Sequence, residues 1–193
     1  MVLPVVKYGD PVLRKKGRPV EKVTPEIQAL IADMIETMSA ARGVGLAAQQ
    51  VGHALLLAVL DVRKAEDRPS TLEIDGKPAD LDAHMPMVLL NPAVKPVNAP
   101  VAGPEGCLSF PEIYTDITRP ETVDVRSLDP EGRVIEFRAG GLLGRAVQHE
   151  LDHLNGILFI DRMTQEDRDD LRPKLDKLQA ATKSALKKSK GGR

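Results

Sequence analysis

The segment His149-Glu150-Leu151-Asp152-His153 places two imidazoles and a carboxylate close together. If it is helical, His149 and His153 lie one turn apart on one face, and Glu150 lies beside them. Two neutral imidazoles suit a divalent ion such as zinc or iron(II), and a neighbouring carboxylate that is not a ligand can carry protons during hydrolysis. The sequence therefore predicts a catalytic metal site on a helix.

Two ligands leave this metal site incomplete. A zinc protease of the H-E-x-x-H-x-x-G-x-x-H type matches as far as Gly156, but Phe159 stands where its last His belongs. Other zinc proteases take their third ligand from an acidic residue farther along the chain. This chain has acidic residues there, although a solvated polar surface also explains their presence. Cys107 is the leading third ligand, because thiolates bind zinc and iron(II) strongly and the surrounding Gly and Pro residues constrain its segment.

Two other roles for Cys107 remain open from the residues alone. A single Cys is often a core residue. A nucleophilic Cys activated by one of the His residues is a further hypothesis, but it leaves the spacing of the two His residues unexplained.

The elements that must position these groups follow from hydrophobic periodicity. Thr24 and Pro25 predict the start of an amphipathic helix that ends near residue 41. Strands are expected at 55–62, 87–91, 121–128 and 133–138, and helices at 142–155 and around the stripe Leu171, Leu175 and Leu178. The polar residues 63–85 predict an exposed excursion or hairpin, which is a candidate lid.

These elements predict an α+β fold. Short antiparallel strands are expected to pack around a central helix that bears the two His residues, with one helix in the N-terminal half and another at the C-terminus. The chain has 193 residues, of which 42% are hydrophobic, as expected for one globular domain.

Composition excludes several classes of protein. A single Cys cannot form an internal disulfide, so a secreted disulfide scaffold is excluded and a cytoplasmic location is expected. The longest uncharged apolar stretch, residues 54–60, is far shorter than the roughly 20 residues of a membrane-spanning helix, so no membrane contact is expected. A monomer is expected as well.

Charge divides the chain into two parts. Residues 171–193 hold eight basic residues and one acidic residue, whereas residues 1–170 hold 19 basic and 27 acidic ones. We therefore expect a catalytic domain over 1–170 and a basic C-terminal helix or tail over 171–193. A solvated helix end explains the tail, and contact with an anionic partner such as RNA is the alternative.

Three segments together resemble the signature motifs of the peptide deformylases, and they occur in that family's order. They are GVGLAAQQ at 43–50, EGCLS at 105–109 and HELDHLNG at 149–156. The resemblance extends from about Tyr8 to Arg162. The short spacing and the helical C-terminus are similar to the type 1 branch of bacteria and organelles.

The resemblance implies hydrolysis of the N-formyl group from formyl-methionyl nascent peptides, which gives formate and a free amine. It implies that Cys107, His149 and His153 hold one divalent ion, with Fe²⁺ expected and Zn²⁺, Ni²⁺ or Co²⁺ as alternatives. Glu150 would act first as general base and then as acid. The resemblance also suggests a C-terminal helix that faces the ribosome.

Further site residues also follow from the resemblance. Gln50 and the backbone N–H of Leu108 would stabilise the oxyanion. Val44 and Gly45 resemble positions beside the family's methionine pocket. Glu105 is expected to line the same cleft and bind the peptide, with a structural role as the alternative.

Tyr114 departs from the family pattern, because many type 1 relatives carry a peptide-contacting Arg at about this position. Asp152 recurs in the family motif, and an ion pair at the surface or beside the metal ligands would explain it. Lys183, Lys187, Lys188, Lys190 and Arg193 would suit contact with the ribosome. Two competing hypotheses are a metal-dependent endopeptidase and a non-catalytic, metal-stabilised module that docks on an RNA-rich partner.

Overall fold

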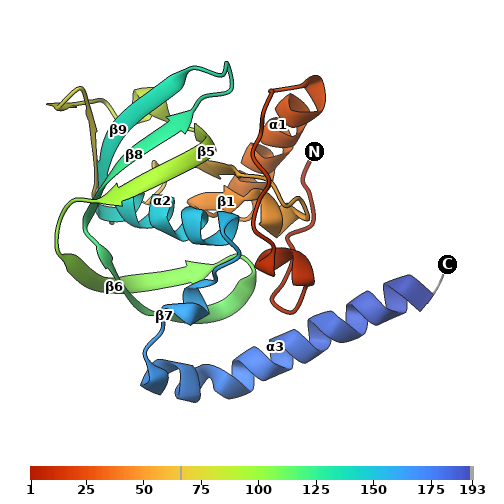
Figure 1. Cartoon of the computed structure of the whole chain (residues 1–193). Helices are drawn as coiled ribbons and strands as arrows, with labels where there is room; N and C mark the ends of the chain where they lie inside the picture. The colour runs from red at the N-terminus through yellow and green to blue at the C-terminus, as the bar shows by residue number, and fades with distance from the viewer. Residues whose placement is uncertain (66, 192–193) are drawn as a thin grey trace.

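The computed structural model describes residues 1–65 and 67–191 (Figure 1). The α-helices are α1 (Pro25–Ala40), α2 (Gly141–Leu154) and α3 (Gln165–Gly191). The strands are β1 (Gly45–Ala47), β2 (Leu57–Leu60), β3 (Ser70–Ile74), β4 (Lys77–Pro78), β5 (Met87–Pro96), β6 (Pro100–Cys107), β7 (Phe110–Pro120), β8 (Thr122–Leu128) and β9 (Val134–Gly140). Single 3-10 turns are η1 (Pro11–Arg14), η2 (Ala48–Val51), η3 (Asp82–His84) and η4 (Phe159–Asp161).

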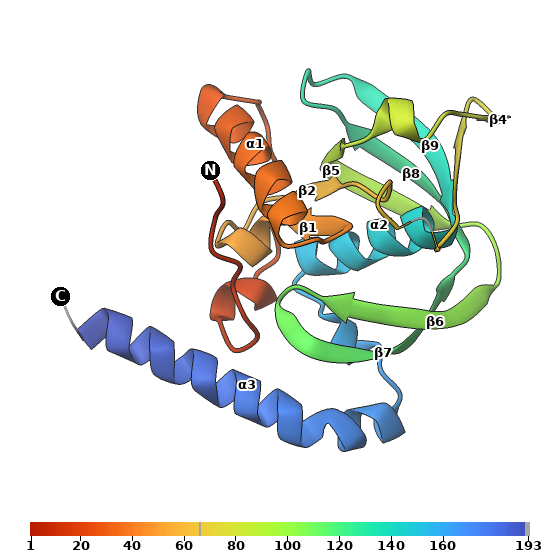
Figure 2. The same ribbon diagram turned by 180° about the vertical axis from the view of Figure 1, so that it is seen from behind.

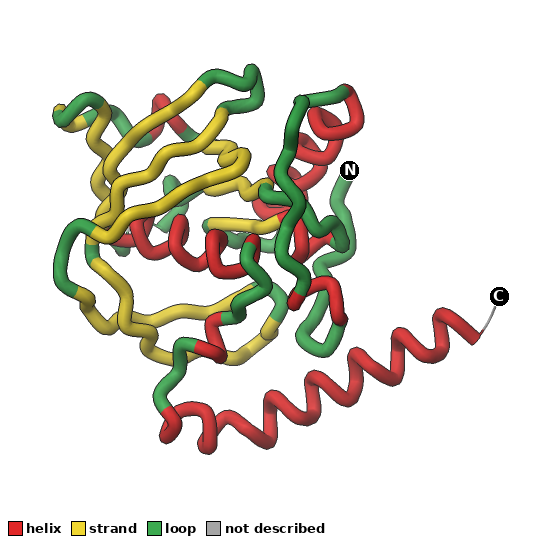
Figure 3. Tube along the Cα trace, in the orientation of Figure 1, coloured by secondary structure: helices red, strands yellow, loops and turns green. Residues whose placement is uncertain are grey.

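The strands form two antiparallel sheets, and α2 lies between them (Figure 3). The larger sheet has seven strands in the order β1-β2-β5-β8-β9-β3-β4, and β6 pairs with β7 in the smaller one. Leu143, Ala146 and Val147 of α2 pack into the core beneath the larger sheet. The described residues thus confirm a mixed fold of helices and antiparallel sheets.

Helix α1 confirms the predicted amphipathic helix. The Thr24 side chain accepts a hydrogen bond from the Ile27 N–H, which caps the helix, and Pro25 occupies its first turn. Met34 and Met38 are almost fully buried in a core shared with β1 and β2. Helix α1 therefore supports the segment that leads into Gln50.

Two parts of the chain differ from the sequence prediction. Residues 100–120 form the β6–β7 hairpin, which was not predicted, because its Pro and Gly residues obscure the alternation typical of strands. Residues 63–85 do contain a hairpin, β3–β4, but the expectation that the whole segment is exposed is wrong. Strand β3 joins β9, and Leu72 is only 4% exposed. A lid function for this segment stays a prediction.

Helix α3 packs on the body from its start as far as Gln179 and Thr182, which lie against Gly9. Thr164 caps it by accepting a hydrogen bond from the Asp167 N–H, and Leu175 is buried against β7 and η4. Figures 1 and 2 show the C-terminal part of α3 projecting beyond the body. The helix is continuous across residues 170 and 171, so the division into two parts stays a prediction.

Two of the basic residues singled out in the tail cannot be placed. Arg193 and the side chain of Lys190 lie outside the described residues. Among the residues that are described, no helix has both the length and the apolar character needed to cross a membrane.

Candidate functional site

A cleft of about 640 Å³ opens between α2, the segment that carries β1 and η2, and the β6–β7 hairpin. Eight of the predicted site residues line it: Val44, Gly45, Gln50, Glu105, Cys107, Leu108, His149 and Glu150. The ninth, His153, adjoins it, with its Nε2 3.2 Å from the Cys107 Sγ. The structure thus brings together residues more than 100 positions apart.

Cys107, His149 and His153 form a compact group of potential metal ligands. One ligand atom from each residue lies within 4.8 Å of the others. Cys107 ends β6 at an irregularity, where the pairing shifts from Gly106–Tyr114 to Cys107–Phe110. Such an irregularity re-aims a side chain, and here it places the thiol beside α2.

Glu105 orients one of the two imidazoles. Its carboxylate accepts a hydrogen bond from His149 Nδ1 at 3.0 Å, which leaves His149 Nε2 for the cleft. Arg119 and Arg145 also donate to this carboxylate. Burial opposes ionisation of Glu105, but the hydrogen bonds from His149 and Arg119 and the charge of Arg119 outweigh it, so the pKa is lowered to about 2. The carboxylate is therefore ionised, and both of its oxygens accept hydrogen bonds from neighbouring side chains.

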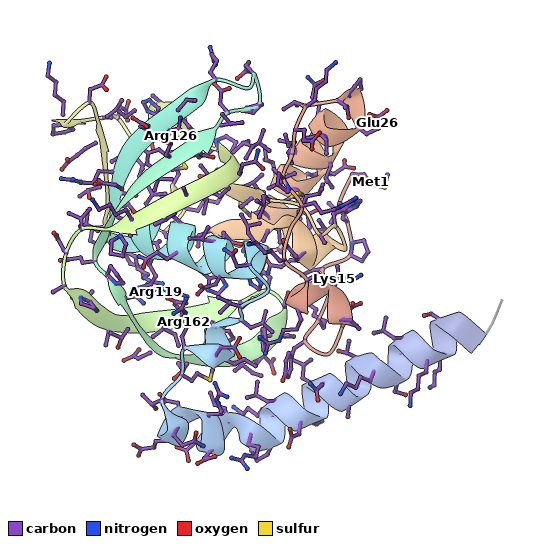
Figure 4. The ribbon with its side chains drawn as sticks, in the orientation of Figure 1. Met1, Lys15, Glu26, Arg119, Arg126 and Arg162 are labelled. Carbon is purple, nitrogen blue, oxygen red and sulfur yellow. The ribbon has the colours of Figure 1, made fainter. Side chains whose placement is uncertain are left out.

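The same arginine links the hairpin to a second carboxylate on α2. Arg119 Nη1 donates to Asp152 Oδ2 at 2.8 Å, and Arg162 Nη2 donates to Asp152 Oδ1 at 2.6 Å. Figure 4 shows Arg119 and Arg162 between α2 and the β6–β7 hairpin. Asp152 is only 6% exposed, and its pair with Arg119 is buried, whereas the Arg162 side chain in the second pair is about half exposed.

Arg119 and Arg145 were not among the site residues predicted from the sequence. Arg119 has the same strand parity as Ile113 and Ile117, which are both buried. An Arg on the inward face of a strand would have indicated a buried ion pair, but this signal requires that β7 be recognised first.

Glu150 is a buried carboxylate with a free oxygen. Oε2 has no hydrogen-bond partner among the described residues, and burial raises the pKa of Glu150 to about 7. A Cβ at Gly45 would lie 2.3 Å from Glu150 Oε1, so only glycine leaves room for the carboxylate here. This carboxyl can take up or release a proton near neutral pH.

Gln50 is held with its amide nitrogen toward the thiol. Its Oε1 accepts from the Ala47 N–H at 2.9 Å, and its Nε2 lies 3.5 Å from Cys107 Sγ and 3.3 Å from Ser109 Oγ. An uncharged N–H donor therefore faces the ligand group. Burial also lowers the pKa of His153 well below its ordinary value, which favours the neutral form that binds metals.

The N-terminal segment joins the two sides of the cleft, and sequence reasoning missed this as well. The Val6 N–H donates to the Gln50 carbonyl at 2.8 Å, and the Lys7 Nζ donates to the Leu108 carbonyl at 2.7 Å. Lys7 also lines the cleft. No motif marks this residue in the sequence, because its role depends on a contact between distant segments.

Comparisons with known proteins point to a single family. The family model described as polypeptide deformylase matches residues 2–169. The chain is 46% identical over 178 residues to the peptide deformylase of Methylacidiphilum infernorum, covering 92% of this chain and 93% of the relative. It is 42% identical over 189 residues to that of Opitutus terrae, covering 97% and 98%. The crystal structure of a peptide deformylase from Legionella pneumophila superposes with a TM-score of 0.76 at 34% identity, covering 100% and 99%.

Proposed function

The chain belongs to the polypeptide deformylase family, and from that premise we propose which of its residues carry the reaction. The reaction is removal of the N-formyl group from nascent peptides, which gives formate and a free amine. The family does not favour the alternative of an endopeptidase. The assignment of residues depends on one observation: Cys107, His149, His153 and Glu150 lie close together at one cleft.

The donor set fits one divalent ion. One thiol and two imidazoles come together, and Glu105 fixes which nitrogen of His149 is available. Soft sulfur with imidazole nitrogen suits iron(II), zinc, nickel or cobalt, and we propose Fe²⁺ as the native ion. When bound, such an ion supplies a Lewis acid that makes water more acidic and polarises a carbonyl. Anaerobic purification with metal analysis tests its identity, and a predominance of another metal would contradict it.

Glu150 is the proposed proton carrier. Its buried carboxylate accepts a proton from the attacking water and delivers it to the departing amine nitrogen of the substrate. A pKa of about 7 suits both steps, because neither form of the carboxyl is strongly favoured at neutral pH. Gly45 makes room for this side chain.

Gln50 and the backbone N–H of Leu108 are the proposed oxyanion donors. Hydrolysis of a formamide develops negative charge on the formyl oxygen, and preorganised N–H donors stabilise it. The Gln50 amide is already oriented by the Ala47 N–H. Losing one such donor costs about 2.7–4 kcal/mol of transition-state stabilisation.

Val44 and Gly45 are proposed to contact the methionine side chain, since both line the cleft beside Glu150. For Glu105 the contacts favour a role in positioning His149, because its carboxylate is occupied by three donors. A substrate contact by Glu105 stays a prediction.

One assay separates deformylation from proteolysis. Metal-loaded protein is incubated with a formyl-Met tripeptide and, separately, with a longer peptide that carries no formyl group. Formate from the first and no new internal amine from the second is the expected result. Internal cleavage without formate would overturn the proposed function.

We also propose that residues 1–170 act as a monomeric cytoplasmic catalytic unit and that 171–193 form a basic arm for the ribosome. The exposed side chains of Lys183, Lys187 and Lys188 on the projecting part of α3 support this arm. Sedimentation as a dimer would contradict the monomeric state. Ribosome binding that does not change when these lysines are replaced would contradict the basic arm.

A further inference from the structure

Charge is unevenly distributed around the mouth of the cleft. Four basic side chains line it. Arg145 is buried and paired with Glu105, whereas Lys7, Arg42 and Arg68 are at least partly exposed. Within the described part of the chain, none of the latter three forms an ion pair with a carboxylate. Residues 1–170 as a whole carry an excess of acidic residues, 27 against 19 basic ones. The cleft is therefore a locally basic region on an acidic body.

The acidic residues of the cleft do not neutralise these cations. Glu105 is buried and occupied by Arg119, Arg145 and His149. Glu150 is also buried, with only 4% of its surface exposed. The accessible charge that a substrate meets on entering is consequently positive.

The three cations come from distant segments of the chain, and Arg42 belongs to a different wall of the cleft from the hairpin that Arg68 and Lys7 contact. Arg42 lies just before β1, on the wall that contains Gly45. Arg68 Nη2 donates to the Pro104 carbonyl at 3.1 Å on the hairpin, and Lys7 Nζ donates to the Leu108 carbonyl. A peptide running out of the cleft would therefore meet basic groups from more than one side.

The backbone at Arg42 gives an independent indication. Helix α1 ends in a Schellman motif, in which the Gly43 N–H bonds to the Met38 carbonyl and the Arg42 N–H bonds to the Ser39 carbonyl. The position of Arg42 has φ of 55° and normally favours glycine. A long side chain such as that of Arg42 costs stability at this backbone position. Its presence there is expected if the side chain serves function.

We propose that the cleft selects formyl-methionyl peptides with a carboxylate in the residues directly after methionine, and that Arg42 is a main determinant of this preference. This inference rests on the proposed function and names the charge class of its substrates. The field of the basic cleft favours the approach and binding of an acidic peptide and disfavours a basic one.

The test compares three peptides, formyl-Met-Asp-Ala, formyl-Met-Ala-Ala and formyl-Met-Lys-Ala, through kcat/KM from formate release. At low salt we expect the Asp peptide to exceed the Lys peptide by about tenfold, which is within the range of electrostatic steering. The ratio should shrink as salt screens the charges. A ratio of one or less in the unmodified protein would overturn the inference.

Arg42→Glu and Arg126→Glu form a matched pair of variants. Both change the net charge equally, but Arg126 lies on β8 in the middle of the larger sheet, paired with Glu136 and away from the cleft. We expect Arg42→Glu to abolish or reverse the Asp-to-Lys ratio and Arg126→Glu to preserve it. Equal changes in both variants would show an effect of overall charge and overturn the role of Arg42.

Arg42→Gly provides a second variant whose folding is not in question. Glycine removes the cost of the left-handed backbone, so we expect the Tm to rise by about 2 °C while the Asp-to-Lys ratio falls. An unchanged ratio in this variant would contradict the inference. The neutral peptide separates the two proposals, because absence of formate from it would refute the proposed function rather than the charge preference.

Discussion

Charged residues behave differently in the core around α2 and along α3. In the core, Arg119 is 4% exposed and bridges carboxylates on β6 and α2. On α3, Arg172 pairs with Asp169 one turn away, and both side chains are about half exposed. The first set joins distant segments of the chain, whereas the second joins neighbours on one helix.

The burial of these groups determines what each set can do. Loss of one partner from a buried ion pair strongly lowers the free energy of unfolding, because the other charge stays buried with neither a partner nor water. An exposed pair contributes little, because water and salt screen it. The core network can therefore hold His149 and the hairpin in fixed positions, and the charges of α3 remain available for an outside partner.

Loss of Cys107 should have the largest effect. Cys107→Ala removes one of three proposed ligands, so metal binding should weaken by more than the roughly 10- to 100-fold that loss of an outer partner costs. Metal analysis of the purified variant and formate release check this. Ser109→Ala, a buried neighbour that is not a proposed ligand, should retain the metal. Full metal content in Cys107→Ala would contradict the assignment.

Loss of Arg119 should destabilise the fold strongly. Arg119→Met leaves Glu105 and Asp152 without their shared partner, which should lower the free energy of unfolding by about 3–5 kcal/mol. Urea unfolding measures this. Arg126→Met, which breaks an exposed pair with Glu136, should change it by only about 0.5 kcal/mol. Similar losses in both variants would remove the distinction between buried and exposed charge.

Neutralising the projecting part of α3 should have the smallest effect on the catalytic unit. Replacing Lys183, Lys187 and Lys188 with Gln should leave the free energy of unfolding within about 0.5 kcal/mol and formate release from a tripeptide unchanged. Ribosome binding measured by co-sedimentation should weaken and lose salt dependence. Salt-sensitive binding that survives these substitutions would contradict the proposed arm.

The sequence predicted the elements whose signals are local. Helix α1 has a capping Thr and an apolar stripe, and β8 and β9 flank the turn at 129–132. The group of potential metal ligands was also predictable, because the spacing of His149 and His153 and the single Cys restrict the choice.

The support of the site was not predictable in the same way. The β6–β7 hairpin lacks a strand signal, so the inward position of Arg119 could not be recognised. Lys7 and Arg145 act through contacts with segments far away in the chain. Arg42 occupies a position at the end of α1 where glycine is usual. Only the positive φ angle of Arg42 shows this.

Glu150→Gln tests the central claim most directly, because it removes the proton carrier while leaving the three proposed ligands in place. Formate release is measured at equal metal content for this variant and the unmodified protein. We predict unchanged metal stoichiometry and a rate lower by about 10²- to 10⁴-fold, the usual contribution of a general base. A near-normal rate at full metal content would contradict the role of Glu150 and the proposed chemistry.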